Sequence, residues 1–212
     1  MTARTDVSLV VAVLEALAGR TPPLVVGIDG RSGGGKSTLA AAGAARLTAE
    51  HGVTAAVLEG DQFYAGGSSA TWDARTAEEK ADMVIDRRRQ RTVLEALLAD
   101  GVAEWRPFDW EADDWDAEEA PLAAASVRTA TADVVLLEGA YSCRPELHDL
   151  LDLLVLLDPP SDLRRQRLLD REGDAYRADW EGRWAEAEDH YFGTVMPPVR
   201  FDLVLGACEA PG

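Results

Sequence analysis

The chain has 212 residues, of which 47% are apolar and 28% are charged, and its 38 acidic and 21 basic side chains give a formal net charge of -17 at pH 7. This composition excludes a disordered chain and predicts one globular domain over residues 1–212. The negative charge argues against a surface that binds nucleic acid or an anionic membrane, because such surfaces need basic patches. A nucleotide would therefore have to bind at a local site.

Two cysteines, Cys143 and Cys208, are too few for a disulfide framework and match no metal-binding spacing. The apolar stretch 9–14 is bounded by Asp6 and Glu15, which argues against a signal peptide. It is also much shorter than the ~20 residues that cross a membrane. We therefore expect a cytoplasmic protein without a membrane segment.

Short runs rich in valine and leucine alternate with segments of helical apolar spacing, which predicts a doubly wound α/β fold of the P-loop type. Its five-stranded parallel sheet would be flanked by helices. We expect a hairpin or flap and then an acidic loop over 101–120. In chain order, the other predicted elements are a helix over 7–18, a strand over 24–28, a helix over 37–51, a strand over 55–58, a helix over 78–100, a strand over 134–137, a helix over 145–151, a strand over 153–157, helices over 161–172 and 179–192, and a strand over 203–205.

The strongest motif is GRSGGGKS at 30–37, which matches the phosphate-binding pattern G-x-x-x-x-G-K-[ST] between a predicted strand and a predicted helix. Glycines let backbone N–H groups face phosphates, and the helix N-terminus adds positive potential. Lys36, one of only two lysines, would reach the β and γ oxygens of ATP, and Ser37 would hold Mg²⁺. The expected nucleotide-binding residues are Gly30, Arg31, Ser32, Gly33, Gly34, Gly35, Lys36, Ser37 and Thr38.

Two carboxylates follow predicted strands at the sheet edge where the P-loop opens. Asp61 comes after the second strand and could accept a proton from an acceptor hydroxyl and help to order Mg²⁺. Glu138 ends the third strand and could fill the acidic role of a Walker B strand, as a metal ligand. Either carboxylate could instead be a helix N-cap or a solvated turn residue.

Arginines are concentrated in the predicted helix 161–172, where Arg164, Arg167 and Arg171 share one face. They could act as a lid, at about 161–178, that neutralises charge on the transferred phosphoryl group. The alternative is a solvated face that pairs with the acidic residues of the same helix, Asp162, Asp170 and Glu172.

The ordered set of motifs resembles the uridine kinase family, whose relatives are phosphoribulokinase and bacterial-type pantothenate kinase. The resemblance covers about residues 24–206. The segments that carry it are the P-loop, DQFY at 61–64, RPFDW at 106–110, the strand that ends in Glu138, and the arginines of 164–171.

This resemblance implies ATP-dependent phosphorylation of a small-molecule hydroxyl, with Lys36 and Ser37 on ATP and Mg²⁺. It also implies that Asp61 is the catalytic base, and that Arg167 and Arg171 lie in the lid. Carried over in the same way, Tyr64, Phe108 and Arg177 would face the acceptor.

The sequence departs from uridine kinases at two places near the expected acceptor site. Phe108 stands where they carry tyrosine, and the acidic stretch 111–119 lacks the histidine that they place there. These departures bear on uridine as the acceptor and not on phosphoryl transfer. Four tryptophans could stack on a planar or apolar acceptor or fill the core, namely Trp72, Trp105, Trp110 and Trp115.

The prediction is therefore a kinase for a small hydroxyl acceptor, nucleoside-like in character. Two alternatives stay open, a kinase for a pantothenate-like or sugar-alcohol acceptor and a nucleotide switch or regulatory ATPase that binds a protein partner. The chain lacks the Asn-Lys-x-Asp motif of GTPases and the Ser-Gly-Gly-Gln signature of transporter ATPases, which favours the kinase. The sequence leaves open whether the chain forms a homo-oligomer.

Overall fold

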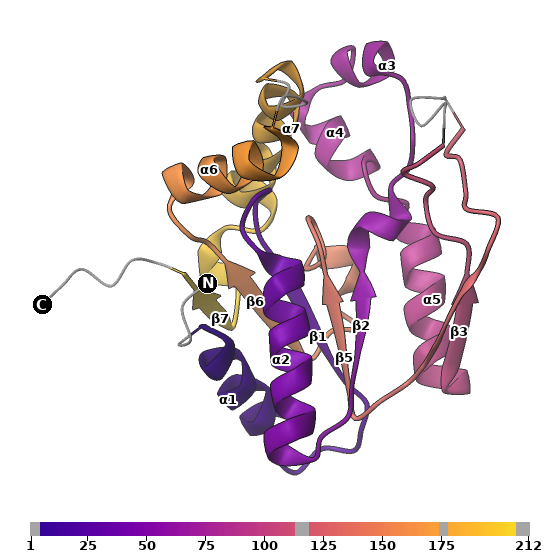
Figure 1. Ribbon diagram of the computed structural model, residues 1–212, viewed down its shortest axis with the longest axis vertical. Helices are drawn as coiled ribbons and strands as arrows, with labels where there is room; N and C mark the ends of the chain where they lie inside the picture. The colour runs from indigo at the N-terminus through magenta and orange to yellow at the C-terminus, as the bar shows by residue number, and fades with distance from the viewer. Residues whose placement is uncertain (1–4, 113–118, 174–177, 207–212) are drawn as a thin grey trace, which may run out of the picture.

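A five-stranded parallel sheet forms the centre of the computed structural model, which describes residues 5–112, 119–173 and 178–206. The strand order is β2-β5-β1-β6-β7, with every neighbouring pair parallel (Figure 1). This confirms the predicted fold class. The strands are β1 (Leu24–Asp29), β2 (Ala55–Glu59), β5 (Val134–Glu138), β6 (Leu153–Leu157) and β7 (Leu203–Leu205).

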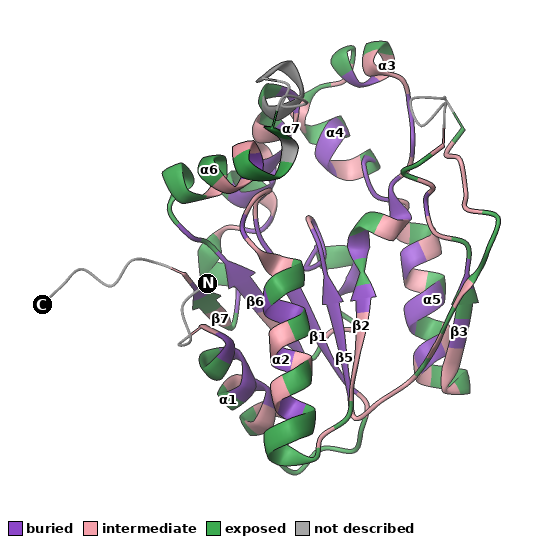
Figure 2. Cartoon of the chain, in the orientation of Figure 1, coloured by how far each residue is buried: buried purple, intermediate pink, exposed green. Residues whose placement is uncertain are grey.

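Both faces of the sheet are covered, as expected for strands that read as continuous apolar runs. All six residues of β1 and all five of β5 are buried (Figure 2). Helices α1 (Thr5–Leu17) and α2 (Lys36–His51) pack on one face of the sheet, and α5 (Arg87–Asp100) contributes to the core on the other.

A layer of helices lies above the carboxyl ends of the strands, where Figure 1 shows the tops of the arrows. In α/β folds of this kind, ligands bind at that edge. The layer therefore marks the place to look for a site. It contains the 3₁₀ turn η1 (Gly60–Phe63) and the helices α3 (Ser69–Asp73), α4 (Ala77–Met83), α6 (Ser161–Glu172) and α7 (Ala178–His190).

The helix predicted over 78–100 is wrong, because the chain forms two helices, α4 and α5. Between them, Asp86 N–H donates to the Phe63 carbonyl at 2.7 Å, and Ala65 N–H donates to the Val84 carbonyl at 2.9 Å. The Asp86 side chain then caps α5. Val84 and Ile85 keep helical spacing with the residues before them, so the apolar pattern concealed this break.

Two further boundaries differ from the prediction. Residues 145–151 form only a 3₁₀ turn, η2 (Pro145–Leu147), because the backbone N–H of Asp152 already pairs with Val25 of β1 at 2.8 Å. Helix α7 ends at His190 and continues as a π-helical turn, η4 (Tyr191–Val195). Short α3 was not predicted.

The hairpin is present, but its second strand lies beyond the predicted segment. Strand β3 (Val102–Trp105) pairs antiparallel with β4 (Val127–Ala130). An isolated bridge between Phe108 and Leu122 ties the long connection together. Residues 113–118 of the acidic stretch lie outside the described residues. Among the helices that the structure describes, none combines the length and apolar character needed to cross a membrane.

Candidate active site

The P-loop joins β1 to α2 and needs glycine at positions where its backbone is crowded. Gly33 has a φ of 72°, and a Cβ there would lie 2.5 Å from the carbonyl oxygen of Arg164 in α6. A Cβ on Gly30 would lie 2.3 Å from the Leu157 carbonyl oxygen. The loop is thus wedged between the end of β6 and the backbone of α6, and no side chain fits at either position.

Lys36 lies at the first position of α2, and its side chain lies against the P-loop. Its Nζ donates to the carbonyl oxygens of Gly30 at 2.8 Å and Arg31 at 3.2 Å. Gly35, the N-cap residue of α2, provides no side-chain cap. Uncapped N–H groups at a helix N-terminus, next to an ammonium group, are suited to bind the phosphates of a nucleotide.

Asp29, the last residue of β1, is a buried residue of the candidate site that the sequence analysis missed. Its buried carboxylate accepts hydrogen bonds from the N–H groups of Gly30, Tyr141 and Cys143 and from the hydroxyl of Tyr191, at 2.8 to 3.0 Å. Burial raises the pKa of Asp29, and the donors act in the opposite direction. Asp29 thereby links the start of the P-loop to the turn after β5. An acidic residue directly before the glycine motif was the available signal.

Glu138 at the end of β5 is buried and lies among the other predicted site residues. Burial raises its pKa to about 7, and the negative charge of Asp61 adds to the rise, while the Lys36 ammonium and a hydrogen bond with Ser37 lower it. These effects place Ser37 within hydrogen-bonding reach of Glu138, and they place Lys36 and Asp61 close enough to act on its charge. The structure thus brings together four residues that the sequence analysis picked from three segments.

The donors around Glu138 are of the type that Mg²⁺ prefers. Ser37 offers a hydroxyl oxygen and Glu138 a carboxylate, and protein sites for Mg²⁺ often supply only one or two carboxylates and leave the rest to phosphate and water. Across residues 5–112, 119–173 and 178–206, no three His, Cys, Asp or Glu side chains form a metal-binding group. The residues fit a metal ion that is shared with a nucleotide.

Two arginines of α6 reach the P-loop, which supports the lid interpretation over a solvated face for this part of the helix. Arg167 Nη1 donates to the carbonyl oxygens of Gly34 at 2.8 Å and Gly33 at 3.4 Å. Arg164 Nη1 donates to the Ser32 carbonyl at 3.4 Å. Arg171 is exposed in the last turn of α6.

Around Tyr64, one of the residues expected to face the acceptor, five aromatic rings form a cluster that we call the aromatic wall. The Tyr64 ring lies 4.8 Å from Phe108, 5.1 Å from Trp110 and 6.3 Å from Trp72, measured between ring centroids. Phe108 is held next to the segment of Asp61 because its N–H donates to the Gln62 carbonyl at 2.8 Å. The wall consists of Tyr64, Trp72, Phe108, Trp110 and Trp184.

The tryptophans divide between core and surface. Trp72 and Trp105 are buried and fill core, whereas Trp110 is 49% exposed and presents a ring to solvent. Trp115 lies outside the described residues, and so does Arg177, the last of the residues expected to face the acceptor.

Helix α7 contributes P-loop contacts that the sequence analysis did not predict. The N–H and the hydroxyl of Ser32 both donate to Oε1 of Glu188 at 2.7 Å. Asp189 pairs with Arg31 at 2.6 Å. No sequence motif marks this pairing, because 156 residues separate Ser32 from Glu188.

A cavity of about 350 Å³ lies elsewhere, beside α4, and its lining includes Asp82, Arg144 and His190. None of the P-loop residues lines it. We therefore place the candidate site by the chemistry of its residues and not by this cavity.

Comparison with known proteins points to one class. No family model matches the chain. It is 28% identical to a uridine kinase of Leuconostoc citreum over 82% of this chain and 79% of the other, and 26% identical to a uridine kinase of Streptococcus gordonii over 82% and 78%.

Solved structures that resemble this chain point to the same class of protein. A candidate fructose transport system kinase from Silicibacter sp. TM1040 superposes with a TM-score of 0.70 and 26% identity over 96% of this chain and 98% of the other. A candidate uridine kinase from Bacillus stearothermophilus superposes with a TM-score of 0.67 and 24% identity, over 95% of this chain and 97% of the other. A D-glycerate 3-kinase from Cryptococcus neoformans superposes with a TM-score of 0.65 and 15% identity, over 88% of this chain and 87% of the other. These last two show a shared fold.

The fold and these relatives make the chain a P-loop kinase, a phosphotransferase that acts on a hydroxyl group of a small metabolite. Within that class it resembles the uridine kinases, as the order of its motifs predicted. The names of its relatives differ in their acceptors, so the comparisons leave the acceptor of this chain unassigned.

Proposed function

We propose that residues 1–212 act as one domain that transfers the γ-phosphoryl group of ATP to a hydroxyl of a nucleoside-like metabolite. The observation that carries the proposal is the meeting of Lys36, Ser37 and Asp61 around the buried carboxylate of Glu138. A phosphate-binding lysine, a hydroxyl ligand and a free carboxylate within one small region are what phosphoryl transfer between two bound substrates requires.

On the nucleotide side, the backbone of residues 30–38 would bind the phosphates, and Ser37 and Glu138 would hold Mg²⁺. The ion neutralises charge on the phosphates when it is bound. Lys36 would stabilise the negative charge that develops on the transferred group. Arg167, whose guanidinium lies against the loop, would add positive charge from α6.

On the acceptor side, Asp61 is exposed at the start of η1, and Tyr64 lies at the end of the same turn. We propose that Asp61 orients the acceptor hydroxyl and accepts its proton. The exposed ring of Trp110 offers a stacking surface beside Tyr64, which favours an acceptor with a planar group.

Phe108 favours an acceptor other than uridine or cytidine. It is buried in the aromatic wall, edge-on to Tyr64, and has no hydroxyl with which to bind the polar edge of a pyrimidine. A site that only packs against its substrate discriminates weakly among acceptors of similar shape. Because of this observation, we retain a second candidate function, that of a kinase for a non-nucleoside acceptor such as a pantothenate-like compound or a sugar alcohol.

Acceptor-dependent ADP formation tests the proposal. The purified chain is incubated with Mg²⁺, ATP and one member at a time of a panel of nucleosides, sugars, sugar alcohols and pantothenate. We expect ADP release with a subset of the panel and only slow release with uridine or cytidine. ATP turnover that no acceptor changes would contradict the proposed function.

A further inference from the structure

Helix α7 contacts both halves of the candidate site. Near the middle of α7, Arg183 Nε donates to Asp73 of α3 at 2.6 Å, and the Trp184 ring lies 5.2 Å from Trp72 in the aromatic wall. Toward the C-terminus of the helix, Glu188 binds the P-loop at Ser32. Glu188 lies five positions after Arg183, about 7.5 Å along the helix axis. One rigid element thus spans the distance between the halves.

Glu188 is built into the P-loop contact and is not a surface residue that happens to be near. Its side chain is only 5% exposed, and one carboxylate oxygen accepts two hydrogen bonds from Ser32. Hydrogen bonds to an ionised acceptor are about twice as strong as neutral ones. The neighbouring Asp189 pairs with Arg31, so two successive residues of α7 bind two successive residues of the loop.

The contact falls where the loop most needs support. Ser32 lies directly before three consecutive glycines, 33–35, which lose more backbone entropy on ordering than other residues do. A loop that is ordered before the nucleotide arrives loses less entropy when it binds. Glu188 holds the residue that leads into the glycines, and Arg167 holds the carbonyls of Gly33 and Gly34 from the other side.

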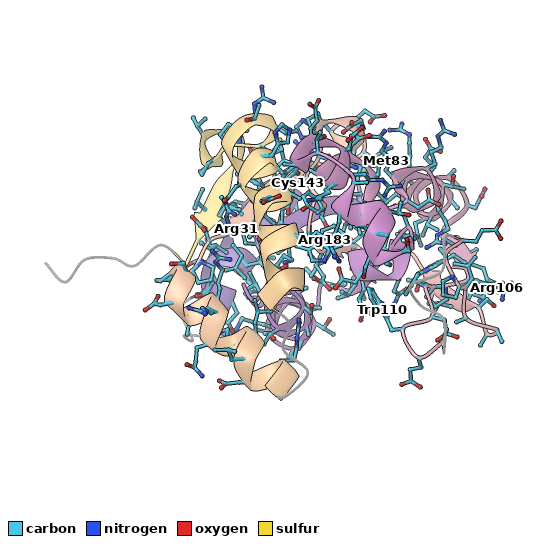
Figure 3. All side chains as sticks on the ribbon, turned by 90° about the horizontal axis from the view of Figure 1, so that it is seen from above. Arg31, Met83, Arg106, Trp110, Cys143 and Arg183 are labelled. Carbon is cyan, nitrogen blue, oxygen red and sulfur yellow. The ribbon has the colours of Figure 1, made fainter. Side chains whose placement is uncertain are left out.

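The middle of α7 is held by two ion pairs in which the cationic side chain is buried and the carboxylate is exposed. Arg183 is 4% exposed and pairs with Asp73, and Lys80 of α4, which is 7% exposed, pairs with Glu186. Figure 3, seen from above, shows Arg183 between Arg31 on the P-loop side and Trp110 on the aromatic side. A shift of α7 at these contacts moves Glu188, because a helix transmits displacement along its axis.

We propose that Glu188 is a positioning residue for the P-loop, and that α7, anchored on α3 through Arg183 and Asp73, sets the nucleotide affinity of the loop. The inference rests on the proposed assignment of residues 30–38 as the nucleotide site. It goes further by placing the control of that site on a helix whose middle residues pack on the proposed acceptor side.

The first experiment measures the dissociation constant of a non-hydrolysable ATP analogue with Mg²⁺ by calorimetry at 15 °C. Glu188→Gln should bind the analogue about tenfold more weakly, because the amide loses the charge that strengthens both hydrogen bonds. Ser32→Ala should weaken binding less, since the backbone N–H still donates. The double variant should be no weaker than Glu188→Gln alone, as expected for two groups in one contact. Glu50→Gln, an exposed change on α2, is the matched control.

Two readouts separate positioning from a general structural role. A merely structural role for Glu188 would lower the melting temperature and leave the analogue affinity at 15 °C unchanged, and that result overturns the proposal. In turnover assays, the KM for ATP should rise about tenfold while kcat stays within about twofold. Lys36→Ala separates this inference from the proposed function. If Lys36→Ala binds the ATP analogue with full affinity, the assignment of the nucleotide site is wrong. If Lys36→Ala loses affinity but Glu188→Gln keeps it, only the positioning role of Glu188 is wrong.

The second experiment tests the link through α7 with Asp73→Asn, which weakens the anchor far from the P-loop. We expect the analogue to bind about threefold more weakly in this variant and no further weakening when Asp73→Asn is added to Glu188→Gln. Non-additive effects at two separated residues indicate that they act through one element. An unchanged affinity in Asp73→Asn, or effects that simply add, would overturn the role of α7.

Discussion

In the proposed nucleotide half of the site, one continuous segment, residues 29–38, supplies the loop, the lysine and the hydroxyl proposed to bind Mg²⁺, whereas the proposed acceptor half draws its rings from four separate segments. Tyr64, Trp72, Phe108 and Trp184 meet only because η1, α3, the flap and α7 pack together. The nucleotide half depends mainly on backbone geometry and helix polarity. The acceptor half depends on side-chain packing, and a single substitution there can change the shape of the site.

This contrast explains why one half is easier to assign than the other. Backbone N–H groups bind any phosphate chain in the same way, so a P-loop is shared by kinases with many acceptors. Variants in the two halves should therefore fail in different ways, and the following predictions are arranged to test that difference.

The largest effect is expected at the junction of the two halves, at Asp61. Asp61→Asn should lower kcat by roughly 10²–10⁴-fold, because the amide cannot accept the proton of the acceptor hydroxyl. Affinity for a non-hydrolysable ATP analogue should stay within about twofold. The measurement is steady-state turnover together with calorimetry. An equal loss of affinity and rate would make Asp61 part of the nucleotide half.

Lys36→Ala should lower kcat by roughly 10²–10³-fold, because it removes the ammonium that compensates charge on the transferred phosphoryl group. The fold should be retained, since the hydrogen bonds of the ammonium go to two carbonyls of the loop itself. Circular dichroism checks folding and a coupled ADP assay checks the rate. Arg128→Ala, an exposed cation on β4, is the control and should leave both unchanged. Normal turnover in Lys36→Ala would refute the phosphate site.

At Glu138, we expect a carboxylate that serves phosphoryl transfer and lowers the folding stability of the protein. Its pKa is raised to about 7 from 4.5, so folding favours the protonated form, and the stabilisation present at low pH is lost as the pH rises from about 4.5 through 7. At pH 8, Glu138→Gln should be more stable than the parent by about 1–3 kcal/mol and nearly inactive. Thermal melts between pH 5 and pH 8 would measure the difference in stability between the variant and the parent. A variant that is less stable than the parent at pH 8 would contradict the expected direction of the effect.

The smallest effect is expected deep in the acceptor half. Phe108→Tyr should raise kcat/KM for uridine, relative to the best acceptor found, by about fivefold, which corresponds to one hydrogen bond of about 1 kcal/mol. ATP affinity should not change. Competition between uridine and that acceptor in one reaction gives the ratio directly. A parent enzyme that already uses uridine with a kcat/KM above roughly 10⁴ M⁻¹s⁻¹ would show that Phe108 does not exclude it.

The same contrast governs what the sequence could reveal. The five strands and the P-loop were predictable because each depends on residues close together in the chain. Glu138 and Asp61 were predictable because parallel strands end at one edge of the sheet. Asp29 was missed because the strand was taken to stop one residue earlier, at Ile28.

The contacts of α7 and of the following turn η4 could not be predicted, because they join residues far apart in the chain. Glu188 binds Ser32, and Tyr191 binds Asp29, across more than 150 residues with no motif to mark either pair. The break at 84–86 was hidden for a related reason. There, hydrogen bonds to Phe63 and Ala65 replace a helical turn that the apolar spacing favours.

The central claim is that this site moves the γ-phosphoryl group of ATP to an acceptor hydroxyl, and ATP labelled in its γ-phosphate tests it most directly. The chain is incubated with the labelled ATP, Mg²⁺ and a mixture of hydroxyl metabolites, and the products are separated and identified by mass. The account predicts that the label leaves ATP and appears in a phosphorylated acceptor, and that this product is nearly absent with Asp61→Asn. Label found only in ATP and inorganic phosphate would contradict it.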